Sequence, residues 1–113
     1  MNDDLNEELR STMDLADEIA FSLKPQGRKK VQAGKDYKIV LRQETLKAKA
    51  EGMAIGLIDK TVAGKENVVE AWVISQIAES DIDSDIELLQ WLKLKARLLD
   101  NQISREWRNP EGL

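Results

Sequence analysis

The chain has 113 residues, of which 42% are hydrophobic, 34% are charged and 4% are aromatic, and its formal net charge is −4. It contains neither cysteine nor histidine, which excludes disulfide bonds, Ser-His-Asp triads, Cys-His pairs and zinc sites built from those residues. The length predicts a single domain, and a composition rich in Leu, Ala, Glu and Lys with only two Pro and six Gly predicts an all-α fold.

Charge is distributed unevenly along the chain. Residues 1–18 carry seven acids and one arginine, a net charge of −6, whereas residues 24–49 carry nine bases and two acids, a net charge of +7. A second acidic cluster follows within residues 79–87. Segregation of this kind favours pairing between segments of one chain or between copies. We therefore expect an elongated helical hairpin or a small helical bundle that self-associates.

The amino-terminal sequence predicts neither export nor membrane insertion. Met1–Asp4 is acidic where a signal peptide carries positive charge, and no long apolar run follows it. The absence of cysteine suits a reducing compartment, so the expected location is the cytoplasm. We expect no cofactor.

Two helices are predicted in the first half of the chain. The first covers about residues 4–23, and the second covers about residues 28–51 and ends at Gly52, a left-handed cap. Lys24-Pro25-Gln26-Gly27 is expected to separate them, because proline disfavours helix in the residue before it and glycine permits a turn. The seam of the first helix has alternating spacings of four and three and consists of Leu5, Leu9, Thr12, Ala16, Ile19 and Leu23.

A short helical segment at 53–63 and a long helix at about 66–107 are predicted in the second half. Ser84-Asp85-Ile86-Glu87 has the form of a capping box, so the long helix either continues through Ser84 or breaks there. The residues expected on its buried side are Ile74, Ala78, Ile82, Ile86, Leu89, Ala96, Leu99 and Ile103, widened by Leu88, Trp91, Leu92 and Leu98.

Two short stretches partly match a calcium-binding loop and a phosphate-binding loop, but each lacks required residues. A calcium loop starting at Asp81 would need glycine at its sixth position and a bidentate acid at its twelfth, and Ile86 and Leu92 stand there. Gly64-Lys65 resembles the end of a phosphate-binding loop, but Glu66 replaces the required Ser or Thr. We expect no metal site, no catalytic residues and no enzyme.

Basic residues recur every seven positions in the second predicted helix. Arg28, Lys35, Arg42 and Lys49 line up along it with Lys38 beside them. One interpretation is a nucleic-acid surface, because such a stripe neutralises phosphates. The other is that these bases face the acids of the first helix or of residues 79–87.

Three tryptophans, Trp72, Trp91 and Trp107, are candidate partner-binding residues in a chain with few aromatics. Tryptophan fills cores and is also enriched at protein–protein interfaces. Trp107 is the strongest candidate, because it lies near the end of the long helix beside Arg105 and Arg108, which are candidates with it.

Several short patterns resemble a loose group of small proteins from phages and prophages of Gram-positive bacteria. They are Tyr37-Lys38, Glu51-Gly52-Met53, Ala63-Gly64, Ala78-Glu79 and Gln102-Ile103-Ser104-Arg105-Glu106-Trp107. The resemblance covers about residues 35–107 and implies a helical hairpin, a phage-type accessory role and the cytoplasm of the host cell. It carries over no functional residue.

Two functions therefore follow as expectations. The first is an accessory protein that acts as a protein–protein interaction module, binding itself and a host or phage protein as an inhibitor or adaptor. The alternative is a nucleic-acid-binding accessory factor in phage replication or recombination that uses the basic stripe.

Overall fold

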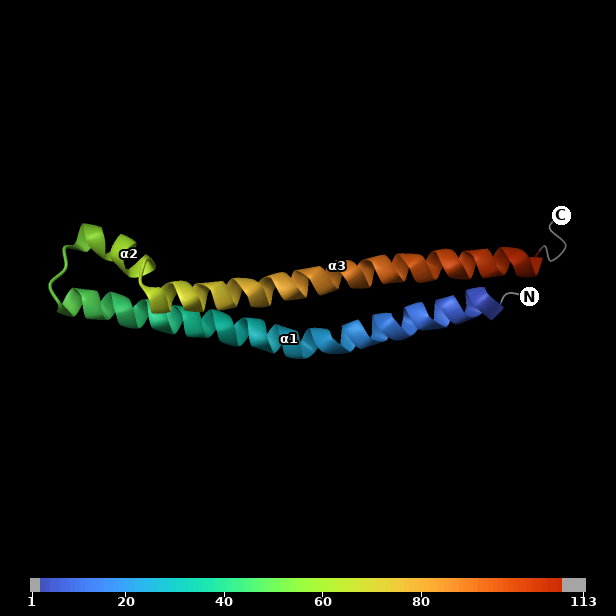
Figure 1. Ribbon diagram of the computed structural model, residues 1–113, viewed down its shortest axis with the longest axis horizontal. Helices are drawn as coiled ribbons and strands as arrows, with labels where there is room; N and C mark the ends of the chain where they lie inside the picture. The colour runs from blue at the N-terminus through green and yellow to red at the C-terminus, as the bar shows by residue number, and fades with distance from the viewer. Residues whose placement is uncertain (1–2, 109–113) are drawn as a thin grey trace. The chain divides into compact units, whose positions relative to one another are not determined.

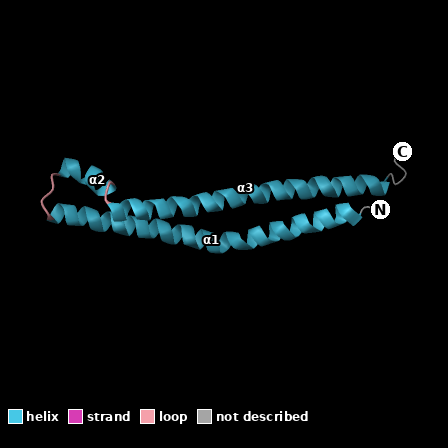
Figure 2. Ribbon diagram, viewed as in Figure 1, coloured by secondary structure: helices cyan, strands magenta, loops and turns pink. Residues whose placement is uncertain are grey.

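A computed structural model describes residues 3–108 of the chain. It contains α1 (Asp3–Ala50), α2 (Ile55–Ala63) and α3 (Glu66–Arg108), and no strand occurs within this range (Figures 1 and 2). The predicted all-α class is confirmed, and Tyr37–Leu41 is helical. No helix in the described range is both long enough and apolar enough to cross a membrane.

The contacts divide the chain into two compact units. Unit 1 combines the first part of α1, up to Lys24, with the part of α3 from Asp83 onward. Unit 2 is Pro25–Ile82 and holds the rest of α1, all of α2 and the start of α3.

The predicted break between residues 24 and 27 is wrong, because α1 is one helix with Pro25 inside it. Proline removes one backbone hydrogen bond and costs about 3 kcal/mol in a helix interior. The seam offsets this cost by continuing in register, since Gln26, Ala33 and Tyr37 follow Leu23 at spacings of three, seven and four and are at least partly buried. Packing thus overrides a local helix-breaking signal.

The long second helix is also continuous, since α3 passes through Ser84 without a break. Its inward residues alternate at spacings of three and four, a seven-residue repeat: Val68, Ala71, Ser75, Ala78, Ile82, Asp85, Leu89, Leu92, Ala96, Leu99, Ile103 and Glu106. The prediction that Ile74 and Ile86 are buried is wrong, because both are exposed. The same correction applies to Leu88, Trp91 and Leu98, which are exposed as well. A step of four residues turns about 40° beyond a full circle, so the predicted run from Ile74 to Ile86 drifts off the seam.

Unit 2 contains a core of closely packed apolar residues. Ala48 of α1, Ile58 and Val62 of α2 and Val68 of α3 are almost fully buried together. The side chains packed around them are Tyr37, Val40, Leu41 and Met53. In this unit α2 lies over the ends of the two long helices (Figure 1). The core therefore depends on all three helices.

The predicted left-handed cap at Gly52 is confirmed. Gly52 has a φ of 80°, its N–H donates to the carbonyl of Lys49 at 3.1 Å, and the N–H of Met53 donates to the carbonyl of Ala48 at 3.1 Å. These two bonds form a Schellman motif, which satisfies the last carbonyls of α1. The motif also carries Met53 onto the core.

Unit 1 is a pair of antiparallel helical segments with a narrower core. The buried residues are Thr12, Ile19, Leu92, Leu99 and Ile103. The Thr12 hydroxyl donates to the carbonyl of Glu8 at 2.7 Å, so its burial leaves no unpaired donor. The two segments are linked by an ion pair in which Lys95 Nζ lies 3.4 Å from Glu8 Oε1.

Candidate interaction surfaces

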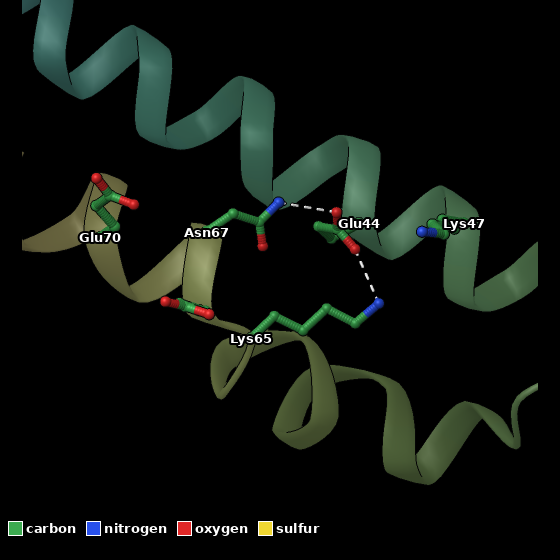
Figure 3. A pocket seen from close by; sticks show the side chains of 6 residues that line it. Glu44, Lys47, Lys65, Asn67 and Glu70 are labelled. Atoms are coloured by element: carbon green, nitrogen blue, oxygen red, sulfur yellow. Dashed lines mark hydrogen bonds and ion pairs between the residues drawn. The ribbon is translucent and has the colours of Figure 1, made fainter.

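A polar cluster fastens α1 to the start of α3 in unit 2. Lys65 Nζ donates to Glu44 Oε2 at 2.8 Å, and Asn67 Nδ2 donates to Glu44 Oε1 at 2.9 Å (Figure 3). The Asn67 side chain also accepts the N–H of Val68 at 3.0 Å. The hollow beside these residues, about 440 Å³, is rimmed by Lys47, Glu66 and Glu70. We interpret this cluster as a structural clamp, because its charged groups already satisfy one another.

The clamp shifts the pKa of both charged partners. The hydrogen bond from Lys65, and then that from Asn67, lowers the pKa of Glu44 below its usual value. The same bond to Glu44 raises the pKa of Lys65. Each shift means that the folded state favours the charged form of the group.

We expect Glu44→Gln to lower stability at pH 7 and to remove part of its pH dependence. The unfolded pKa of Glu is about 4.3, so the Glu44 contribution is complete above that pH and is lost as pH falls through the lower folded pKa. The Lys65 contribution is complete below about pH 10.4 and is lost as pH rises through the raised folded pKa. Urea midpoints at pH 7 and pH 3 measure the effect, with Glu70→Gln on the same rim as the control. Equal midpoints for the wild type and Glu44→Gln at pH 7 would contradict the clamp.

The predicted basic stripe lies along one exposed face of α1. Arg28, Lys35, Lys38, Arg42 and Lys49 are all exposed, and none of them forms an ion pair within residues 3–108. The interpretation that they pair with acids of the same chain is therefore not supported. Successive seven-residue steps separate these bases by about 10.5 Å.

The three tryptophans occupy different surroundings. In unit 2, Trp72 lines a hollow of about 200 Å³ together with Tyr37, Ala63, Val68 and Val69. In unit 1, Trp107 is exposed near the end of α3, and Arg105 and Arg108 beside it are exposed as well. The exposed fractions of Trp72, Trp91 and Trp107 are 48%, 56% and 80%, so none of these side chains fills a core.

The strongest exposed apolar feature of unit 1 is a row on α3 that we name the ridge: Leu88, Trp91, Leu94 and Leu98. Each of the four is exposed despite being large and apolar. Lys95 Nζ lies 5.5 Å from the centroid of the Trp91 ring and also pairs with Glu8 of α1. Lys95 therefore contacts both the Trp91 ring and the other helix of unit 1.

Unit 1 also has a groove between its two helical segments. Its floor is apolar, with Leu9, Ala16, Leu92 and Ala96, and Met13 stands at its mouth. Its rim carries both signs of charge, from Asp17, Lys93, Arg97 and Asp100, and its volume is about 520 Å³. The groove exists because Ala16 and Ala96 occupy seam positions, and their side chains are too short to fill the space between the segments. The groove was not predicted from the sequence. Its only sign in the sequence is that an alanine occupies a seam position on each of the two helical segments.

No group of three or more acids is arranged to hold a metal ion in the described range, and the segment from Asp81 to Glu87 is helical. No family model, curated protein or solved structure matches the chain. The surfaces are therefore interpreted from their own geometry.

Proposed function

We propose that the protein is a helical protein–protein interaction module, a small phage-type accessory protein of the host cytoplasm that binds a partner protein and a second copy of itself. The observation that carries this proposal is the unit 1 groove. Its apolar floor lies open between two helical segments, and charged side chains stand along its rim. Such a groove fits an amphipathic helix, whose apolar stripe enters it while its polar flanks meet the rim.

The partner expected from this chemistry is a helix with an apolar stripe flanked by charges of both signs. Lys93 and Arg97 would pair with acids of the partner, and Asp17 and Asp100 with its bases. Binding as an inhibitor or an adaptor needs no chemistry beyond this contact. Trp72, and Trp107 with Arg105 and Arg108, stay predicted partner contacts outside the groove.

Affinity purification of the tagged chain from host lysate, with and without nuclease, tests this proposal. A nuclease-resistant protein is expected with the wild type, and Met13→Asp should reduce its recovery about tenfold or more, because docking would bury an unpaired charge. Leu46→Asp is the matched control, since Met13 is 52% exposed and Leu46, also on α1, is 55% exposed. Equal recovery with both variants would reject the groove as the partner site.

Nucleic-acid binding is the second candidate, and the free basic stripe is the observation that favours it. Within residues 3–108, these five exposed bases form no ion pair and are available to phosphates. Tyr37, the nearby aromatic, packs against the unit 2 core, so base stacking gains little from it. In the same purification, a catch that disappears with nuclease and with Arg42→Glu/Lys49→Glu would favour this candidate over the first.

A further inference from the structure

The exposed apolar residues of the ridge are regularly spaced, which distinguishes the ridge from a solvated surface with scattered apolar residues. Leu88, Trp91, Leu94 and Leu98 recur at spacings of three, three and four, so they form a second apolar stripe on α3 beside the seam. Leu15 of α1 extends this stripe. It lies seven residues after Glu8, and Leu88 lies seven residues before Lys95, the partner of Glu8, so these two leucines stand on the same edge of the antiparallel pair.

Lys95, which lies over the Trp91 ring of the ridge, does not oppose docking. Lys95 lies over the Trp91 ring and pairs with Glu8, so its head group is already neutralised and its aliphatic stem adds to the apolar surface.

We infer that the ridge is the interface for a second copy of this chain, packed antiparallel so that the two unit 1 hairpins form a four-helix bundle. A two-fold axis near residue 93 opposes Leu88 of each copy with Leu98 of the other and Trp91 with Leu94. Such an isologous interface uses the same patch twice and therefore closes at two copies. In a four-helix bundle, two helical pairs whose own cores are narrow share one larger core, and this is a common stable fold.

Charge complementarity selects the second copy and its direction. On α3 in unit 1, the exposed acids Asp83 and Glu87 precede the ridge, whereas the exposed bases Arg105 and Arg108 lie beyond its other end. An antiparallel arrangement brings the acidic end of each copy toward the basic end of the other. A parallel arrangement would place the two acidic ends together, and repulsion between them opposes it.

This inference rests on the proposed function, because it names the surface by which the module binds itself. Sedimentation equilibrium of the full chain is expected to show a monomer–dimer equilibrium, and Leu98→Glu should raise its Kd about tenfold or more, since a charge would enter the interface. Leu57→Glu on α2 is the matched control, because Leu57 and Leu98 are both 58% exposed. Unchanged helicity by circular dichroism shows that each variant folds.

Cysteine cross-linking tests the direction, since the chain has no cysteine of its own. In the inferred dimer, the two copies of Ser84 lie about 27 Å apart along the helix axis, whereas Ser84 faces Gln102 of the other copy. Ser84→Cys alone should therefore not cross-link, and a mixture of Ser84→Cys with Gln102→Cys should. Cross-linking of Ser84→Cys with itself would overturn the antiparallel interface.

The inference and the proposed function fail separately. A chain that stays monomeric at all concentrations, or a dimer that Leu98→Glu leaves intact, refutes the ridge and leaves partner binding through the groove standing. A ridge-dependent dimer whose partner recovery is unaffected by Met13→Asp supports the ridge and refutes the groove.

Discussion

Ile58→Ala is expected to lower the free energy of unfolding by about 2–5 kcal/mol, as truncation of a buried isoleucine does. Ile58 is 3% exposed and packs with Ala48, Val62 and Val68, a cluster that draws on all three helices. Its helix, α2, has nine residues, which is too short to be stable alone in water. Loss of this side chain therefore removes the contact that keeps α2 folded on unit 2.

Urea denaturation followed by circular dichroism measures this effect. The matched control is Ile55→Ala, because Ile55 belongs to the same short helix and is 88% exposed. That substitution should change stability by less than about 0.5 kcal/mol. Similar losses for the two variants would contradict the packing of α2 on the core.

Pro25→Ala is expected to raise the free energy of unfolding by about 1–3 kcal/mol. Proline in a helix interior costs about 3 kcal/mol relative to alanine, and alanine restores the donor that bonds the carbonyl four residues earlier. The greater freedom of the unfolded alanine chain reduces this gain by about 0.4–1 kcal/mol. Pro25 is exposed, so its replacement disturbs no core contact.

Lys24→Ala serves as the control for this substitution, because Lys24 is an exposed neighbour in the same helix. It should leave the denaturation midpoint almost unchanged. A lower midpoint for Pro25→Ala than for the wild type would show that the chain does not form a continuous helix at this point.

Local chemistry predicted the helix ends well where packing and local signals agree. Gly52 is the example, since a left-handed residue followed by Met53 both ends α1 and delivers an apolar side chain to the core. Pro25 shows the opposite case. There the packing of seam residues on both sides of Pro25 outweighs one missing backbone hydrogen bond. The predicted break was based on residues 24–27 alone, which do not include this packing.

The register of α3 shows why apolar residues alone do not identify a buried face. Ile74 and Ile86 are as apolar as Ile82, yet only Ile82 falls on the three–four repeat that faces α1. The helix has more apolar residues than one seam can bury. The excess is what forms the ridge, so the error in predicting the core and the discovery of a candidate surface have the same cause.

The candidate sites depended on pairings that the sequence does not display. The sequence predicts Trp91 as a partner-binding residue, but the contact of its neighbour Lys95 with Glu8 requires knowing which residues of α1 lie opposite α3. The groove likewise needs Ala16 and Ala96 to lie on facing seams. The clamp joins Glu44 to residues 21 and 23 positions away, a separation that no helical periodicity predicts.

Under the proposed function, this chain binds a partner protein and a second copy of itself. Native mass spectrometry of the tagged chain, purified from host lysate after nuclease treatment, tests it most directly. The predicted result is a complex of two copies of the chain with a stoichiometric partner protein, from which Met13→Asp removes the partner and Leu98→Glu separates the copies. A single copy with no bound protein, at concentrations where the chain is fully helical, would contradict the claim.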